Sequence, residues 1–272
     1  CVRLPLRPDT DTWTPMCTVT SFRNDTELLV TMNRDEALVR GAEIPPAIHA
    51  ETGHSQWIAP ADSDKGGTWM GVNEHGVVAC LLNAYLPGES LLPDPSGEYR
   101  SRGEIIPEVM AQASAAESLR WVRESLDASP YPSFNLFVFT PDSGHCFTWY
   151  RQSGLVTETI GPQWHIRTSS GWDSDDVTHW RNERFAAWQK DGCATVGTLP
   201  TFHLLRVTGE EELSPLMLRS WSSTRSITQA RVDLREGQIE LRYWGTPEPD
   251  SGEPSHTLSL PLAGEKHAVR KV

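Results

Sequence analysis

Short apolar segments separated by turn residues dominate the chain and constrain its fold more than any other feature. Up to Tyr85, segments rich in β-branched and apolar side chains alternate with turn sequences such as RND and NEHG, a pattern typical of β-hairpins. Later segments of the same kind predict further strands, with a hairpin turn at 235–237. The predicted strands lie at 17–22, 27–33, 68–73, 76–85, 134–140, 145–151, 154–160, 223–234, 238–244 and 256–262.

Two other segments carry helical periodicity. Over 101–128 apolar residues recur near a helical period, and Pro107 falls early, where the first turn of a helix tolerates it. A second helix is predicted over 173–189, because acidic residues suit its N-terminal turn. The passage 192–212 is expected to be rich in loops. Strand blocks alternating with helix blocks predict one α+β layered domain with mostly antiparallel sheets.

Charge and cysteine content exclude several classes of protein. The 272 residues include 36 acidic and 24 basic side chains, a net charge of −12, without a basic run that would bind nucleic acid or an anionic membrane. The 5 cysteines are scattered and form no CxxC pair, which argues against a disulfide framework or a zinc site and favours a cytoplasmic setting. No apolar run reaches the ~20 residues of a membrane span. We expect no metal and no cofactor, and oligomeric state stays open.

Cys17 opens the first predicted strand, directly behind Met16. We expect residues 1–16 to be an extension or a mis-set start that the mature protein lacks, and residues 17–272 to form a single domain. Met16 as the true initiator, a cleaved propeptide and a start assigned too early are the three explanations. In each of them Cys17 becomes the first residue.

An N-terminal cysteine would carry both a nucleophile and its base. A free α-amine titrates near ~7.7–8.0 and a thiol near ~8.5, so the amine can take the thiol proton near neutral pH. An amine still joined to Met16 by a peptide bond is not basic, so this chemistry requires that the preceding residues be absent.

Four motifs follow one another along the first part of the chain. They are MCTVTSF at 16–22, TMNRDEALVR at 31–40, GGTWMGVNEHGVVACLLNAY at 66–85 and SRGEIIP at 101–107. In this order they resemble the NRDE family, also called transport and Golgi organisation-like proteins. The order and spacing are also similar to the cysteine branch of the N-terminal nucleophile (Ntn) hydrolases, which includes bile salt hydrolases, penicillin V acylases and acid-ceramidase-like amidases.

The resemblance implies a four-layer αββα sandwich and hydrolysis of a linear C–N amide. Cys17 would be the nucleophile, and Arg34 and Asp35 would hold the thiolate and orient the terminal amine. Asn83 would help to form the oxyanion hole, and Arg225 would be a second arginine of the catalytic site. The substrate would be a small-molecule amide of unknown identity.

One position departs from the family pattern. Where the amidases carry an asparagine that donates to the oxyanion, this chain has Ser169 and Ser170. A serine hydroxyl can donate one hydrogen bond and could substitute, although it is shorter and rotates freely. Trp69, within the third motif, is expected to join these serines in binding the substrate.

The alternative to an amidase is a protein that binds and hands over a hydrophobic small molecule. Haem and lipids have been proposed as such ligands among NRDE relatives, and the old active-site cleft would then serve as the pocket. A third possibility is a partner-binding domain that only retains the fold, because fold does not fix function.

Overall fold

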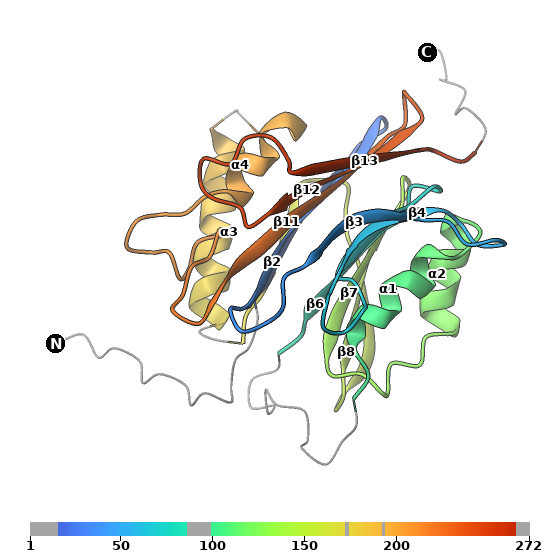
Figure 1. Ribbon diagram of the computed structural model, residues 1–272, viewed down its shortest axis with the longest axis horizontal. Coiled ribbons are helices and arrows are strands. Elements are labelled where there is room, and N and C mark those ends of the chain that lie inside the picture. The colour runs from blue at the N-terminus through green and yellow to red at the C-terminus, as the bar shows by residue number, and fades with distance from the viewer. Residues whose placement is uncertain (1–15, 86–98, 172–173, 192–193, 265–272) are drawn as a thin grey trace.

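Two antiparallel sheets lie face to face in the computed structural model, which describes residues 16–85, 99–171, 174–191 and 194–264 (Figure 1). One sheet has six strands in the order β10-β1-β2-β11-β12-β13, and the other has seven strands in chain order from β3 to β9. The six-stranded sheet consists of β1 (Cys17–Arg23), β2 (Glu27–Ala37), β10 (His165–Ser169), β11 (Ser222–Asp233), β12 (Gln238–Gly245) and β13 (His256–Pro261). The seven-stranded sheet consists of β3 (Ile44–His49), β4 (Trp57–Ala61), β5 (Met70–Asn73), β6 (Val78–Asn83), β7 (Phe134–Phe139), β8 (Gly144–Tyr150) and β9 (Gly154–Thr159).

Helices cover the outer face of each sheet. Helices α3 (Ser174–Lys190) and α4 (Leu199–His203) lie on the six-stranded sheet, and α1 (Ile105–Met110) and α2 (Ala115–Glu124) lie on the seven-stranded sheet (Figure 1). Short 3-10 turns, η1 (Arg102–Glu104) and η2 (Val196–Thr198), precede α1 and α4. The layers therefore follow the order helix, sheet, sheet, helix, and the αββα prediction is confirmed.

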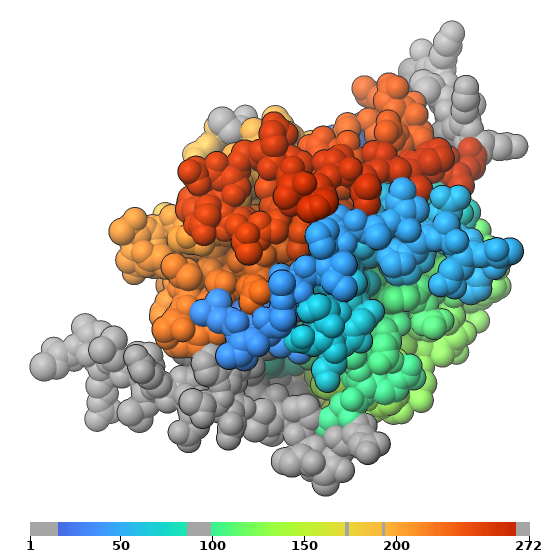
Figure 2. All heavy atoms as spheres, viewed as in Figure 1, coloured from blue at the N-terminus to red at the C-terminus, as the bar shows by residue number. Residues whose placement is uncertain are grey.

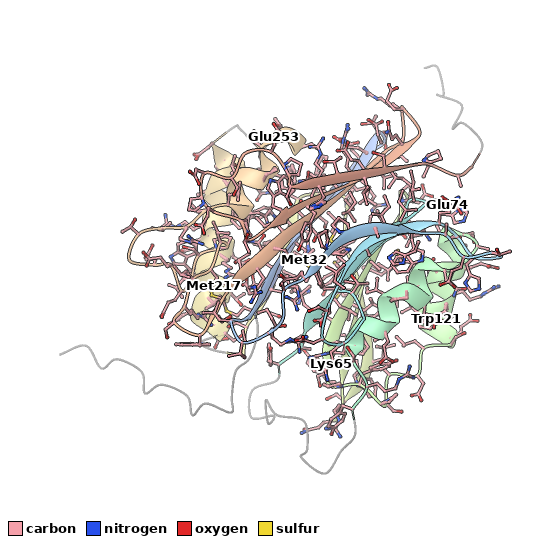
Figure 3. All side chains as sticks on the ribbon, in the orientation of Figure 1. Met32, Lys65, Glu74, Trp121, Met217 and Glu253 are labelled. Carbon is pink, nitrogen blue, oxygen red and sulfur yellow. The ribbon has the colours of Figure 1, made fainter. Side chains whose placement is uncertain are left out.

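The alternation of side chains along β2 shows how the sequence builds these layers. Val30 and Met32 point into the core between the sheets, where Figure 3 shows Met32, whereas Leu29 points the other way and packs against Phe185 and Phe202 of the helix layer. Successive residues of a strand face opposite sides, so a strand covered on both sides is apolar on both. On the face drawn in Figure 2, β13 adjoins β3, and the two sheets meet along this edge.

The predicted strands are confirmed, and so is the second helix, which begins at Ser174 in the described residues and ends at Lys190. Three strands, β3, β4 and β10, were not predicted. Prolines interrupt the apolar pattern of β3 and β4, and β3 and β10 are edge strands, where weak strand sequences are tolerated.

The prediction of one helix over 101–128 is wrong in its continuity, because the segment divides into η1, α1 and α2. Side chains from neighbouring elements end α1: Asn73 Nδ2 donates to the Met110 carbonyl at 3.0 Å, and Ser55 Oγ donates to the Gln112 carbonyl at 2.7 Å. Ser114 then starts α2 by accepting a hydrogen bond from the Glu117 amide at 3.2 Å. The loop-rich prediction for 192–212 is also wrong over 196–203, where η2 and α4 form.

Candidate active site

Cys17 lies at the first position of β1, one of the inner strands of its sheet. It pairs with Arg34 of β2 on one side and Ser169 of β10 on the other. Directly paired residues of antiparallel strands share a face, so all three side chains start on the side that faces the second sheet. Cys17 belongs to the core cluster between the sheets and is 8% exposed.

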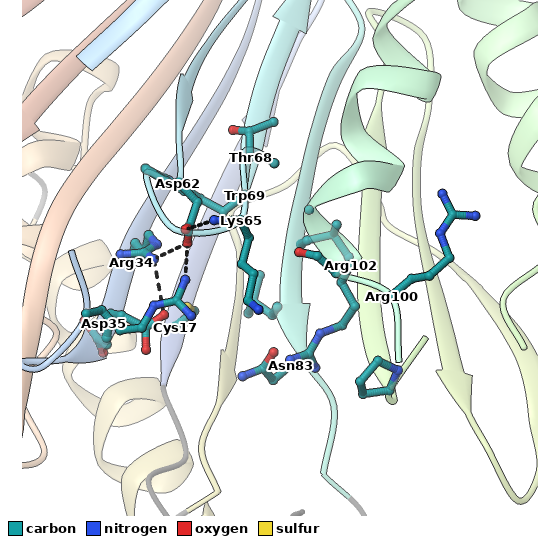
Figure 4. Close-up of a pocket in the computed structure, with 18 of the residues that line it drawn as sticks. Cys17, Arg34, Asp35, Asp62, Lys65, Thr68, Trp69, Asn83, Arg100 and Arg102 are labelled. Atoms are coloured by element: carbon teal, nitrogen blue, oxygen red, sulfur yellow. Dashed lines mark hydrogen bonds and ion pairs between the residues drawn. The ribbon is translucent and has the colours of Figure 1, made fainter. Parts of the chain in front are cut away.

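A cavity of about 320 Å³ opens beside this cysteine. Its walls come from both sheets and from the turn around η1, so segments far apart in the chain meet here (Figure 4). Five of the predicted site residues line it, namely Cys17, Arg34, Asp35, Trp69 and Asn83. No histidine is among the described residues of the walls.

Met16 holds the backbone of Cys17 in place. Its carbonyl accepts a hydrogen bond from the Asp35 amide at 3.1 Å, and its fully buried side chain packs against Val177 and Met217. The nitrogen of Cys17 is therefore an amide in this form of the chain. Residues 1–15 of the predicted extension lie outside the described residues.

The Cys17 thiol is held in its protonated form. Burial raises its pKa to about 12, and the negative charge of Asp35 acts in the same direction. A hydrogen bond from the Asp35 backbone and the charge of Arg34 lower the pKa, but less strongly. At neutral pH this thiol needs a base before it can act as a nucleophile.

Asp35 is fully buried and faces the helix layer, although it also reaches the cavity wall. Thr224 donates a hydrogen bond to its Oδ1 at 2.6 Å, and the guanidinium of Arg181 on α3 lies 3.6 Å from its Oδ2. Oδ2 accepts no hydrogen bond from the part of the chain that the structure describes. Burial raises the pKa of Asp35 to about 6, against the lowering effects of Arg181 and Thr224.

Arg34 is anchored by carboxylates rather than by the thiol. It forms an ion pair with Asp62 at 3.0 Å (Figure 4). It also forms ion pairs with Glu36 at 3.2 Å and with Glu43. Its guanidinium carbon lies 4.6 Å from the ring centre of Trp69, a cation–π contact. These contacts fix the arginine beside Cys17, where its charge favours the thiolate.

Asn83 ends β6 and presents its amide to the cavity. Its Nδ2 donates to the Tyr85 hydroxyl at 2.9 Å, and its second N–H has no acceptor among the described residues. Ser169 pairs with Cys17, and its buried Oγ finds no hydrogen-bond partner among the described residues. Ser170 is buried one residue further on, and neither serine is among the described residues that line the cavity.

Arg225 lies away from these groups. It occupies an irregularity in the β2–β11 pairing, between Thr224 and Ser226, and is not among the described residues that line the cavity. Its Nε lies 3.8 Å from Glu43, the same carboxylate that pairs with Arg34. The structure therefore connects Arg225 to the site through Glu43.

Sequence reasoning missed Arg181 and Glu43, the charged partners behind Asp35 and Arg34. A signal for Arg181 was present, because it lies with Val177, Trp180 and Phe185 on the buried stripe of α3. Charged residues are almost never fully buried unless they are paired, so an arginine on such a stripe predicts a buried carboxylate nearby. Glu43 lies in the segment before β3 and gave no comparable signal.

Neither a metal centre nor a membrane helix emerges from the described ranges. No group of three or more His, Cys, Asp or Glu side chains in them is arranged to hold a metal ion. None of their helices is long and apolar enough to cross a membrane.

Comparison with known proteins identifies the family and the fold. A sequence profile of the family described as Transport and Golgi organisation 2 matches residues 16–224. No curated protein sequence matches the chain.

Among solved structures, the chain is similar to an N-acylethanolamine-hydrolyzing acid amidase ortholog from Caenorhabditis elegans, at 12% identity with a TM-score of 0.50, over 78% of this chain and 91% of that chain. It is also similar to two variants of conjugated bile acid hydrolase from Clostridium perfringens. One matches at 10% identity and TM-score 0.51 over 92% of this chain and 97% of that chain, and the other at 11% and 0.51 over 90% and 92%. At such identities the likeness establishes the fold, the αββα sandwich of Ntn hydrolases.

Proposed function

The chain belongs to the Transport and Golgi organisation 2 family, and from this premise we propose that it hydrolyses a linear C–N amide with Cys17 as an N-terminal nucleophile. The position of Cys17 is the observation that carries the proposal. It is the first residue of an inner strand, and its side chain borders a cavity that can hold a small substrate. The amide-hydrolysing proteins named above share this fold, which supports the reaction class without specifying a substrate.

The site supplies a nucleophile but no side-chain base of the usual kind. The Cys17 thiol is protonated at neutral pH, and no described histidine borders the cavity. Removal of Met16 would convert the Cys17 amide into an amine on the same residue as the thiol. That amine would act as the base for the thiol on the same residue.

The reaction then proceeds in two halves. The amine takes the thiol proton, the sulfur attacks the substrate carbonyl, and a C–S bond forms as the carbonyl oxygen becomes an oxyanion. Asn83 and Ser169 donate hydrogen bonds to that oxygen, a contribution worth ~2.7–4 kcal/mol for one donor in a comparable hydrolase. The ammonium returns its proton to the leaving nitrogen as the C–N bond breaks. In the second half, water gives a proton to the amine as its oxygen attacks the thioester. The C–S bond breaks, the acid is released, and the ammonium returns the proton to the Cys17 sulfur.

Asp35 positions the new amine. Its Oδ2 lacks a hydrogen-bond donor among the described residues, and its own amide already binds the carbonyl next to the Cys17 nitrogen. A carboxylate at this place stabilises the ammonium form through a charge-assisted hydrogen bond. Arg181 limits this effect, since it shares the carboxylate.

The test compares two forms of the chain, one begun at Met16 and one that retains residues 1–16. Intact mass and N-terminal sequencing identify the first residue, and iodoacetamide labelling gives the rates at Cys17 and at the fully buried Cys80. In the form begun at Met16 we expect Cys17 to be the terminus and to react at least about tenfold faster than in the retained form, because only the free amine can take the thiol proton. That processed form should also release amines from a library of acyl amides.

Equal Cys17 rates in the two forms, or a processed chain that cleaves no amide in the library, would contradict the proposal. The binding of haem or a lipid would then become the leading hypothesis. Charged side chains from Arg34 to Arg102 line much of the cavity, which favours a polar substrate over a wholly hydrophobic ligand.

A further inference from the structure

Arg102 is a cavity-lining cation that the proposed mechanism does not use. It opens η1 within the SRGE motif and lines the same cavity as Cys17. One guanidinium nitrogen, Nη1, donates to the Ser133 carbonyl at 2.9 Å. No other described residue accepts a hydrogen bond from this guanidinium, so the remaining donors of its planar fork can bind another partner.

The other arginines of the cavity walls are neutralised. Arg34 pairs with Asp62 and two glutamates, Arg40 pairs with Asp62, and Arg100 pairs with Glu104. Within the described ranges, by contrast, no carboxylate lies at ion-pair distance from Arg102. The same is true of Lys65, an exposed side chain on the cavity wall after β4. Arg102 and Lys65 are therefore the two cations of the cavity wall without an ion-pair partner among the described residues.

Cationic side chains outnumber anionic ones on the cavity wall, although the chain as a whole carries a net charge of −12. Five cationic and three anionic side chains line the cavity, and the two cations without an ion pair among the described residues are Arg102 and Lys65. A partly buried cation without a counter-charge favours an anionic ligand.

Two glycines fix Arg102 in the wall. The Thr68 amide donates to the Gly103 carbonyl at 3.1 Å, which ties the η1 turn to the segment before β5. A Cβ at Gly67 would lie 2.6 Å from the Gly103 carbonyl carbon, so the two backbones can approach this closely only without side chains. These contacts hold the backbone next to Arg102 against the segment before β5.

Arg102 lies close to the predicted oxyanion site. Figure 4 shows its side chain extending toward Asn83. Asn83 donates to the Tyr85 hydroxyl, whose pKa is raised by burial, and the charge of Arg102 opposes that rise together with this hydrogen bond. Burial also lowers the pKa of Arg102, with Tyr85 and Cys17 acting against it. A group bound to Arg102 would therefore sit near the carbonyl that Cys17 attacks.

We infer that Arg102, assisted by Lys65, binds an anionic group of the substrate close to the scissile bond, so that the substrates are acidic amides. That the substrate is an amide rests on the proposed function, whereas its negative charge is inferred from the cavity alone. A carboxylate matches the guanidinium fork with two parallel hydrogen bonds, and a phosphonate offers the same oxygen chemistry.

The first experiment alkylates Cys17 with iodoacetate and with iodoacetamide, which differ in charge and little in size. The ratio of the two rates is divided by the same ratio for free cysteine. We expect the corrected ratio to favour iodoacetate by about 10-fold or more, as a charge-assisted hydrogen bond would give. Arg102→Gln should remove this preference and Arg102→Lys should keep part of it. Arg100→Gln, which changes an arginine already paired with Glu104, should leave it intact.

The second experiment uses Cys17→Ala, in which no covalent step can occur. Isothermal titration with phenylacetate and with phenylacetamide should show tighter binding of the acid, by about 10-fold, and Arg102→Gln in the same background should abolish the difference. Benzylphosphonate in a third titration distinguishes a phosphoryl group from a carboxylate. Thermal unfolding of each variant confirms that it is folded.

The outcomes separate this inference from the proposed function. A preference for the anion that depends on Arg102 supports the inference even when no amide is hydrolysed. Amide turnover without any preference for the anion overturns the inference and leaves the hydrolase standing. A preference that survives Arg102→Gln, or no anion-dependent effect in either experiment, also overturns it.

Discussion

At the residue scale, Asp35 and Arg181 form an ion pair from which water is excluded. Both side chains are fully buried, and Arg181 also donates to the Leu213 and Ser214 carbonyls. We predict that Asp35→Asn lowers the free energy of unfolding at pH 7 by about 3–5 kcal/mol, because it leaves a buried guanidinium without a counter-charge. Urea denaturation measures the change, and Asp25→Asn, in an exposed turn, is the control.

The cost of Asp35→Asn should also depend on pH. Burial raises the pKa of Asp35 from 3.8 to about 6, so between these pH values the native protein binds a proton that the unfolded chain does not. The wild type therefore gains stability as the pH falls through this range, whereas Asn does not titrate, and the difference between the two proteins should grow as the pH falls from 7 to 4. A difference that stays constant over this range would show that the pKa of Asp35 is not raised in the native protein.

His203 should make the stability fall in acid. Burial lowers its pKa from 6.5 to about 3, and its ring is held by Thr20, at 2.7 Å, and by Asn33. Below pH 6.5 the unfolded chain binds a proton that the folded chain excludes. This group therefore contributes stability above pH 6.5 and loses it as the pH falls toward 3, by about 1.4 kcal/mol per pH unit.

The measurement compares unfolding free energies of the wild type and His203→Gln at several pH values between 7 and 4. The variant loses hydrogen bonds at every pH, so it is the less stable protein at pH 7. Because only the wild type loses stability by protonation of His203 in the unfolded chain, the difference in unfolding free energy between the two proteins should narrow as the pH falls. The exposed His54→Gln should follow the wild type. Parallel pH curves for the wild type and His203→Gln would refute the prediction.

At the scale of elements, the contact between Gly67 and Gly103 couples the turn at η1 to β5. Gly67→Ala would place a Cβ 2.6 Å from backbone atoms of Gly103, so one segment must move. We predict a loss of about 1–3 kcal/mol in unfolding free energy, the usual cost of overpacking, together with a loss of the iodoacetate preference because Arg102 shifts.

Gly161→Ala is the matched control. Its new Cβ meets nothing within 4 Å, and its backbone is not in the left-handed region, so the change should stay within about 0.5 kcal/mol. If Gly67→Ala is as stable as this control and keeps the anion preference, the two segments do not fix the arginine.

The sequence predicted those elements whose pattern is local. The strands from β5 to β9 carry apolar runs between turn residues, and the motif spacing brought Cys17 and Arg34 into one hairpin, where they pair directly. The break between α1 and α2 was not predictable in this way, because it depends on Asn73 and Ser55 from the other layer. For the same reason the sequence did not reveal the partnership of Asp35 with Arg181.

At the scale of the whole molecule, one core joins the two sheets. Met32 of β2 and Leu82 of β6 belong to the same buried cluster, so neither sheet can lose its inner face without exposing the other. Met32→Ala should remove about 2–5 kcal/mol of stability. Because the core is shared, we expect both sheets to unfold at the same lowered urea concentration.

Hydrogen exchange read by mass spectrometry can test this for each sheet separately. Peptides from β7 and from β12 should lose protection together in the wild type, and together at lower urea in Met32→Ala. Leu155→Ala, on the edge strand β9 and 39% exposed, should shift neither by more than about 0.5 kcal/mol. If β12 exchanges while β7 stays protected, the sheets are separate cooperative units and the prediction of a single domain over 17–272 is wrong.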